Sequence, residues 1–152
     1  MNILMINKYY YKRGGADIVF INEKELLEIH HHNVIPFSMH HPNNQKTEYA
    51  RYFVSNINFE TRSIIHSINA AFNVIYSFEA RAKLKKLLSI YHVDVAHLHN
   101  YHHQISPSIL GPLKQKKIPI IMTVHDFKII CPNYRMLALD GICERCKGRK
   151  YY

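Results

Sequence analysis

Short apolar runs alternate along this chain with longer segments in which apolar residues recur at helical spacing. Residues 2–7 hold a continuous apolar run, which is typical of a parallel strand covered on both faces. Residues 16–30 then have the spacing of a helix, and residues 33–37 form a second apolar run. The order strand, helix, strand predicts one βαβ unit at the start of the chain.

The predicted helix over 16–30 has a broad apolar surface. One face carries Ile18, Val19, Leu26 and Ile29, whereas Phe20 and Leu27 fall off that face. A surface of this width suits a helix that packs on a sheet and also against a neighbour.

The middle third of the chain is predicted to hold two helices or one bent helix. Apolar residues recur at helical spacing in residues 61–77 and again in residues 80–91. Four cations, Arg81, Lys83, Lys85 and Lys86, lie off the apolar stripe of the second segment. This pattern is that of a basic amphipathic helix, whose outer face suits either solvent or an anionic membrane surface.

Two further strands are predicted over 93–99 and 118–124, and the second has the clearest apolar pattern of all. Between them, Ser106 and Pro107 have the residue types of an N-cap and a first helical position. Pro112 predicts a kink or a late helix start, because an interior proline costs about 3 kcal/mol. Strands and helices alternating at this spacing predict an α/β fold with a Rossmann-like parallel sheet and flanking helices, formed by residues 1–152 as one domain.

Composition limits the class of protein. The longest apolar stretches fall far short of the roughly 20 residues that a bilayer span needs, and residues 1–7 lack the basic flank of a signal peptide. We therefore expect a cytoplasmic protein. The 20 Lys and Arg against 11 Asp and Glu give a net charge of +9, which favours anionic partners without choosing among them. No nucleic-acid module surrounds the basic, tyrosine-rich residues 8–13, so no specific nucleic-acid partner is expected.

Gly14 and Gly15 lie between the first predicted strand and its helix. In open α/β sheets the carboxyl ends of the strands are where ligands bind, and a helix N-terminus favours phosphate. These glycines match neither the dinucleotide nor the P-loop spacing, so a tight turn that needs glycine for its backbone is an equal alternative.

Polar residues follow two other predicted strands at the same sheet edge. His125 and Asp126 come just after residues 118–124, so a histidine oriented by a carboxylate can face a sugar hydroxyl or a phosphate there. His97, His99 and Asn100 end the preceding strand. Alternation puts His97 and His99 on one face, close enough for joint metal ligation, but no Glu or Cys at a familiar spacing completes a ligand set. A polar crevice wall is the interpretation that the spacing favours.

The three cysteines are Cys131, Cys143 and Cys146. A CxxC pair with a third cysteine upstream allows a small zinc loop, for which His125 is a fourth ligand to consider. Three reduced thiols are the simpler interpretation in a chain without a targeting segment.

Taken together, these segments resemble the N-terminal domain of glycosyltransferase family 4, which has the two-domain GT-B fold. The likeness rests on residues 2–7 with Arg13, Gly14 and Gly15, on the strand that ends in His99 and Asn100, and on the strand that ends in His125 and Asp126. The segment from Asp126 to Tyr134 and the Cys143/Cys146 pair resemble a cysteine-bearing subgroup of that family.

The resemblance implies a retaining transfer of sugar from a nucleotide-sugar donor to a glycan, lipid-linked or other acceptor, with no required cofactor or metal. It implies donor phosphates near Gly14 and Gly15, and His125 and Asp126 beside the transferred sugar. A C-terminal donor-binding domain is absent from residues 1–152, so the chain alone is expected to be inactive. A peripheral contact with the inner membrane face is a further expectation. A non-catalytic binding module or fragment, and a small zinc protein, remain as alternatives.

Overall fold

The computed structural model of the chain describes residues 1–56, 75–102, 105–131, 133–139 and 141–146. Most of the helix predicted over 61–77 lies outside these residues. The other predicted strands and helices can be compared with the structure one by one.

A four-stranded parallel sheet forms the centre of the molecule. Its strands are β1 (Asn2–Ile6), β2 (Asn33–Phe37), β3 (Val95–Leu98) and β4 (Ile120–Met122), in the order β2-β1-β3-β4. The predicted α/β, Rossmann-like fold is confirmed.

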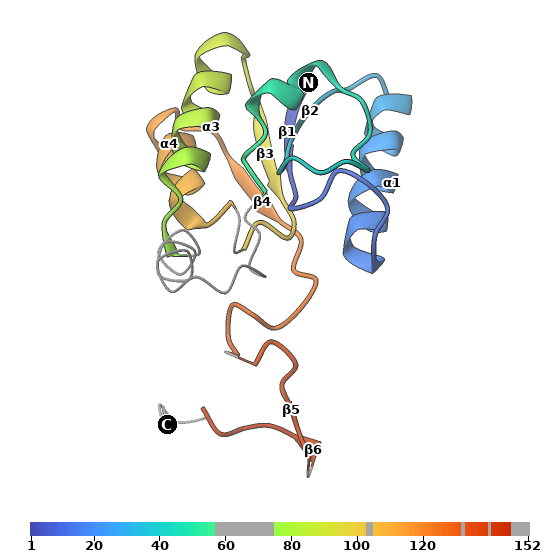
Figure 1. Ribbon diagram of the computed structural model, residues 1–152, viewed down its shortest axis with the longest axis vertical. Helices are drawn as coiled ribbons and strands as arrows, with labels where there is room; N and C mark the ends of the chain where they lie inside the picture. The colour runs from blue at the N-terminus through green and yellow to red at the C-terminus, as the bar shows by residue number, and fades with distance from the viewer. Residues whose placement is uncertain (57–74, 103–104, 132, 140, 147–152) are drawn as a thin grey trace.

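The helices lie in two layers on opposite faces of this sheet. Figure 1 shows α1 (Gly15–Ile29) on one face, and α3 (Phe78–Ile90) with α4 (Leu110–Gln115) on the other. β1 leads through α1 to β2 on one side, whereas β3 leads through α4 to β4 on the other. The chain therefore reverses its direction of winding between the neighbours β1 and β3. Open α/β sheets form a ligand crevice at such a switch point.

The core lies between the sheet and these helices. Leu4, Met5 and Ile6 of β1 have no exposed surface, and neither have Leu84 and Leu87 of α3. Ser77 caps α3 by accepting a hydrogen bond from the Ala80 N–H. Burial of the stripe on α3 leaves its cations at the surface, as the sequence predicts.

α1 packs on the sheet through a different face from the one its sequence favours. Phe20 and Ile21 are fully buried, whereas Leu26 and Ile29 are 55% and 71% exposed. The residues of α1 that pack on the sheet follow helical spacing from Asp17. The buried Asp17 carboxylate accepts a hydrogen bond from the Asn7 side chain. Both faces of this helix are apolar, so periodicity alone cannot select the buried one.

The connection to β4 begins as predicted. Ser106 caps the short 3-10 helix η2 (Pro107–Ile109), Pro107 takes its first position, and α4 starts only at Leu110. Pro112 then falls in the first turn of α4, where no backbone N–H is needed.

β4 is an edge strand of the sheet that the structure describes. It has three residues, pairs with β3 alone among the described strands, and leaves Ile121 56% exposed. An apolar run indicates a strand but does not tell an edge position from a central one.

Two smaller elements complete the described chain. The 3-10 helix η1 (Glu48–Tyr52) packs beside β2 and α3. Beyond β4 the chain leaves the sheet and ends in the short hairpin of β5 (Leu137–Ala138) and β6 (Gly141–Ile142), which extends away from the helices (Figure 1). Among the described residues, no helix combines the length and apolar character that crossing a bilayer requires.

Candidate functional site

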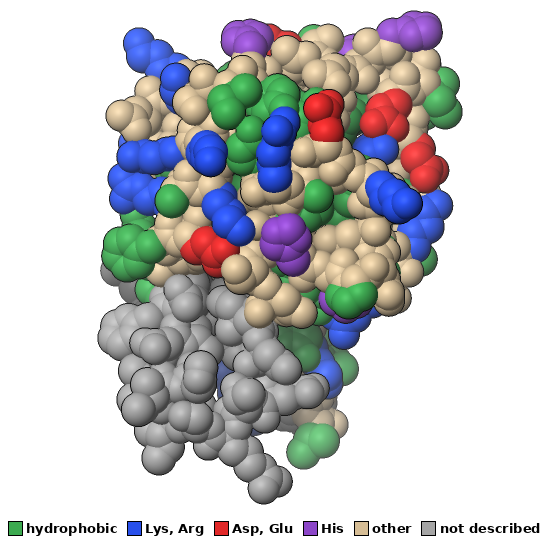
Figure 2. Space-filling model, turned by 45° about the horizontal axis from the view of Figure 1, so that its top comes forward, with side chains coloured by type: hydrophobic (Ala, Val, Ile, Leu, Met, Phe, Trp, Pro, Cys, Tyr) green, Lys and Arg blue, Asp and Glu red, His purple; other side chains and the backbone are tan. Residues whose placement is uncertain are grey.

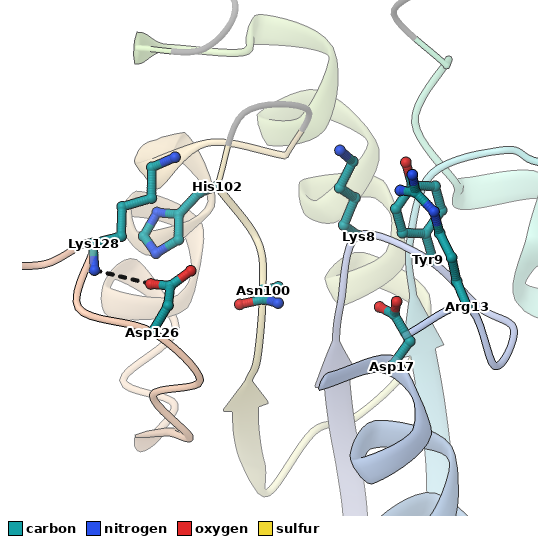
Figure 3. Close-up of a pocket in the computed structure, with 8 residues that line it drawn as sticks. All are labelled: Lys8, Tyr9, Arg13, Asp17, Asn100, His102, Asp126 and Lys128. Atoms are coloured by element: carbon teal, nitrogen blue, oxygen red, sulfur yellow. Dashed lines mark hydrogen bonds between the residues drawn. The ribbon is translucent and has the colours of Figure 1, made fainter. Parts of the chain in front are cut away.

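A hollow of about 250 Å³ lies beyond the carboxyl ends of β1, β3 and β4. It is lined by Lys8, Tyr9, Arg13, Asp17, Asn100, His102, Asp126 and Lys128. Figure 3 shows Lys8, Tyr9, Arg13 and Asp17 on one side, Asp126, His102 and Lys128 on the other, and Asn100 between them. We call this hollow the switch-point pocket, because it lies where the sheet reverses its winding.

The buried side chain of Asn7 holds the walls of this pocket together. Its amide donates to the Asp17 carboxylate at 2.9 Å and to the Tyr9 carbonyl at 2.8 Å. Its carbonyl oxygen accepts from the Asn100 N–H at 3.2 Å. One residue at the end of β1 therefore fixes the start of α1 and the end of β3.

Three cations and two carboxylates face the switch-point pocket. The Lys8 ammonium and the Arg13 guanidinium lie 4.9 and 4.5 Å from the centre of the Tyr9 ring, which gathers both charges on one wall. Burial, and then the Arg13 charge, lower the pKa of Lys8, while Asp17 acts in the opposite direction. Lys128 adds a third cation from the other wall.

The opposite wall is organised around Asp126. Its carboxylate accepts from the Lys128 N–H at 2.9 Å, which closes a tight turn. Burial lowers the pKa of His102, and the Lys128 charge lowers it further. The His102 ring is therefore uncharged at neutral pH and can donate or accept a hydrogen bond.

The two glycines lie where the pocket meets α1. Gly14 takes the N-cap position with extended backbone (φ −148°), and Gly15 opens the helix. Neither has a positive φ, so their backbone conformations do not require glycine. A Cβ on Gly15 would meet no atom of the described residues within 4 Å. The space beside Gly15 is therefore open within the described part of the chain, and neither glycine is required by the backbone conformation of the turn.

Behind the pocket, three histidines form a row on the α1 side of the sheet. The His99 ring stacks on His125, with Nδ1 of His99 3.0 Å from Nε2 of His125, and it meets the Phe20 ring edge-on. The Nε2 atom of His97 lies 2.8 Å from the Thr123 hydroxyl. Burial lowers the pKa of His99 to about 3 and also lowers that of His97, so both rings are neutral at physiological pH.

The candidate residues from the sequence thus fall in two places. Asn100 and Asp126 line the pocket, whereas Gly14 and Gly15 lie at the start of α1, between the lining residues Arg13 and Asp17. His99 is buried behind it. His125 has His99 as its hydrogen-bond partner, whereas Asp126 bonds to backbone.

The cysteines lie away from this site. Cys131, Cys143 and Cys146 are free thiols around another hollow of about 250 Å³ beside the β5–β6 hairpin. Among the residues that the structure describes, the set of three potential ligand atoms within 4.8 Å of one another is formed instead by Glu23, His97 and His99.

Sequence reasoning missed much of the pocket. It did not single out Asn7, Asp17, His102 or Glu23, and it treated Lys8 and Arg13 only as part of a basic loop. The available signal was that Asn7 ends the first predicted strand and Lys8 directly follows it.

No family model, curated protein or solved structure matches this chain. The resemblance to glycosyltransferase family 4 therefore stays a prediction, and the geometry of the switch-point pocket carries the functional argument.

Proposed function

We propose that this chain is the acceptor-side half of a retaining glycosyltransferase and that its switch-point pocket binds the diphosphate of a nucleotide-sugar donor. One observation carries the proposal: Lys8, Arg13 and Lys128 converge with the N-terminus of α1 on a single hollow. Cations and free helix N–H groups are the two features with which proteins bind phosphate.

The other lining groups suit a ligand that carries hydroxyls as well as phosphate. Asp17 and Asp126 accept hydrogen bonds, and Asn100 and neutral His102 both donate and accept them. Carboxylates in a site for a bare anion would oppose binding, whereas a sugar or ribose hydroxyl gives them a donor to pair with. The mixed lining therefore favours a sugar phosphate or nucleotide over inorganic phosphate.

In the proposed transfer, the bond from the anomeric carbon to a diphosphate oxygen breaks. A bond to the acceptor hydroxyl oxygen forms with the same configuration, and the hydroxyl proton leaves with the diphosphate. Lys8, Arg13 and Lys128 would stabilise the charge that develops on the leaving group. Asp126, which lines the pocket, is assigned to the reacting sugar. His125, which precedes it and is bonded to His99, is assigned to the border of the same site, and the acceptor to the adjoining surface of this sheet.

We base the proposed class of acceptor on the positive charge of the face that carries α3 and α4. Lys and Arg side chains gather on the left of the view in Figure 2, the side that carries α3 and α4 in Figure 1. Lys85 and Lys116 line a hollow there, with exposed Lys86 nearby in the sequence. A basic surface on the same chain fits a lipid-linked acceptor held at an anionic membrane.

Ligand binding to the purified chain tests the pocket assignment. Calorimetric titrations would compare a nucleoside diphosphate, inorganic pyrophosphate and a free monosaccharide. We expect the nucleoside diphosphate to bind best, pyrophosphate more weakly, and the monosaccharide least.

A pair of neighbouring variants locates the binding. Arg13→Gln removes a charged partner of the phosphate and should weaken nucleotide affinity about 10–100-fold, the equivalent of about 1.5–3 kcal/mol. Lys12→Gln is the matched control, because Lys12 is exposed and makes only a 3.8 Å contact with Glu25. Equal losses in both variants would indicate nonspecific attraction to a basic protein and would contradict the proposal.

A further inference from the structure

Three potential metal ligands converge between α1 and β3. Glu23 comes from α1, His97 from β3, and His99 from the position just after the end of β3. The Oε2 atom of Glu23 lies 3.1 Å from Nε2 of His99 and 3.9 Å from Nδ1 of His97. The packing of α1 on the sheet thus brings Glu23 to two histidines that lie far from it in the sequence.

Two of these atoms are buried and unsatisfied. Within the described part of the chain, Nε2 of His99 and Oε2 of Glu23 have no hydrogen-bond partner, although they lie 3.1 Å apart. His99 has a fully buried side chain. A buried carboxylate oxygen beside a ring nitrogen costs free energy unless a proton or a cation lies between them.

The spacing suits a tetrahedral metal ion. Zinc binds imidazole nitrogen and carboxylate oxygen at about 2.0–2.2 Å, which places ligand atoms about 3.3–3.5 Å apart. The observed separations of 3.1 and 3.9 Å fall on either side of that value. The three ligand atoms all lie within 4.8 Å of one another, so side-chain rotations would bring them to ligating distance.

In each histidine ring, the nitrogen that would not bind the metal already has a hydrogen-bond partner. Nε2 of His97 lies 2.8 Å from the Thr123 hydroxyl, and Nδ1 of His99 lies 3.0 Å from Nε2 of His125. If the inward nitrogens ligate, the outward ones carry the protons and donate to these groups. Histidine ligands in proteins are held in this way by outer partners that fix the tautomer.

We propose that Glu23, His97 and His99 bind a divalent transition metal ion, zinc by preference. Two histidines and one carboxylate are a common zinc set, and three protein ligands leave a fourth position for water or a ligand. The ion would join α1 to β3 directly behind the switch-point pocket, and this inference does not depend on the donor proposal.

The cysteines must be separated from this site in any test. The chain would be stripped with a chelator and studied in two forms, native and with Cys131, Cys143 and Cys146 all replaced by serine. We expect the cysteine-free form to bind one equivalent of Zn²⁺ by calorimetry and to gain thermal stability. Co²⁺ in this form should show a tetrahedral visible spectrum without the sulfur-to-cobalt charge-transfer band of thiolate ligands.

Variants in the cysteine-free form identify the ligands. Glu23→Gln keeps the size of the side chain but loses its charge, and it should weaken Zn²⁺ affinity by at least about 10-fold, since even outer-shell changes cost that much. Glu25→Gln, an exposed carboxylate on the same helix, should leave affinity unchanged. His97→Gln is a second test that does not depend on the folding of the first variant.

Two results would overturn the proposal. One is failure of the cysteine-free chain to bind Zn²⁺ or Co²⁺. The other is binding that survives both Glu23→Gln and His97→Gln, which would indicate an adventitious ion only, held by the exposed histidines of residues 30–32.

Discussion

At the scale of single residues, the Asn7 side chain joins three parts of the candidate site, Tyr9, Asp17 and Asn100. Asn7→Ala would leave the buried Asp17 carboxylate and the Asn100 N–H without this partner. We expect the free energy of unfolding to fall by about 2–4 kcal/mol, since each orphaned group costs about 1–3 kcal/mol. Denaturant titration measures this change. Asn22→Ala, at an exposed position of α1, is the control and should change stability by less than about 0.5 kcal/mol. Similar small effects in both variants would contradict the structural role of Asn7.

Lys8 gives the pocket a pH dependence. Its pKa is lowered from 10.5, first by burial and then by Arg13, against the opposing charge of Asp17 and beside the Tyr9 ring. A lysine with a lowered pKa loses its charge at lower pH than an exposed one. Nucleotide affinity should therefore fall as pH rises from neutrality and before pH 10.5 is reached.

Lys8→Arg separates this effect from other titrations. Arginine stays charged throughout this range, so the variant should bind the nucleoside diphosphate with a flatter pH profile. Calorimetric affinities at a series of pH values measure the difference. Identical profiles for the two proteins would show that Lys8 does not contact the ligand.

At the scale of elements, α1 has two apolar faces with different roles. Phe20 is fully buried against the Tyr10 and His99 rings, whereas Leu26 is 55% exposed. Phe20→Ala should lower stability by about 3–5 kcal/mol, and Leu26→Ala by less than about 0.5 kcal/mol. Thermal or denaturant unfolding compares the two. A larger loss for Leu26→Ala would mean that the helix docks through the face that its periodicity favours.

The elements themselves were largely predictable, because their signals are local. The apolar run of residues 33–37 matches β2, and the Ser106-Pro107 pair matches the start of η2. The edge position of β4 and the buried face of α1 were not predictable, because both depend on partners distant in the sequence. The same reason explains the missed ligand: Glu23 reaches His97 and His99 only through the packing of α1 on β3.

The sequence indicated which edge of the sheet holds the candidate site, but not which side chains line it. The rule that ligands bind beyond parallel strands selected Asn100 and Asp126, which line the pocket, and Gly14 and Gly15, which lie at the start of α1. It could not tell which of His99 and Asn100 faces the pocket, since that depends on where β3 ends. His99 is buried behind the pocket and Asn100 lines it.

At the scale of the whole molecule, the basic surface over α3 and α4 predicts a salt-sensitive membrane contact. Of the four cations of α3, Lys83 is paired with Glu79 at 2.9 Å and Arg81 donates to the Tyr76 hydroxyl, which leaves exposed Lys85 and Lys86 for lipid. Lys85→Glu with Lys86→Glu should abolish most co-sedimentation with anionic vesicles, as should raised salt. Lys46→Glu, in an exposed loop, should have little effect. Vesicle binding that changes neither with salt nor with the double charge reversal would show that this surface is not the membrane contact.

The central claim is that the switch-point pocket binds a nucleoside diphosphate, and mapping the bound ligand by NMR tests it most directly. Titration of the labelled chain should give saturable chemical-shift changes at the Gly15 and Asp17 amides of α1 and at Asn100, because these border the cations of the pocket. Arg13→Gln should reduce the changes and Lys12→Gln should not. Changes confined to the basic surface of Lys85 and Lys116, or none that saturate, would contradict the account.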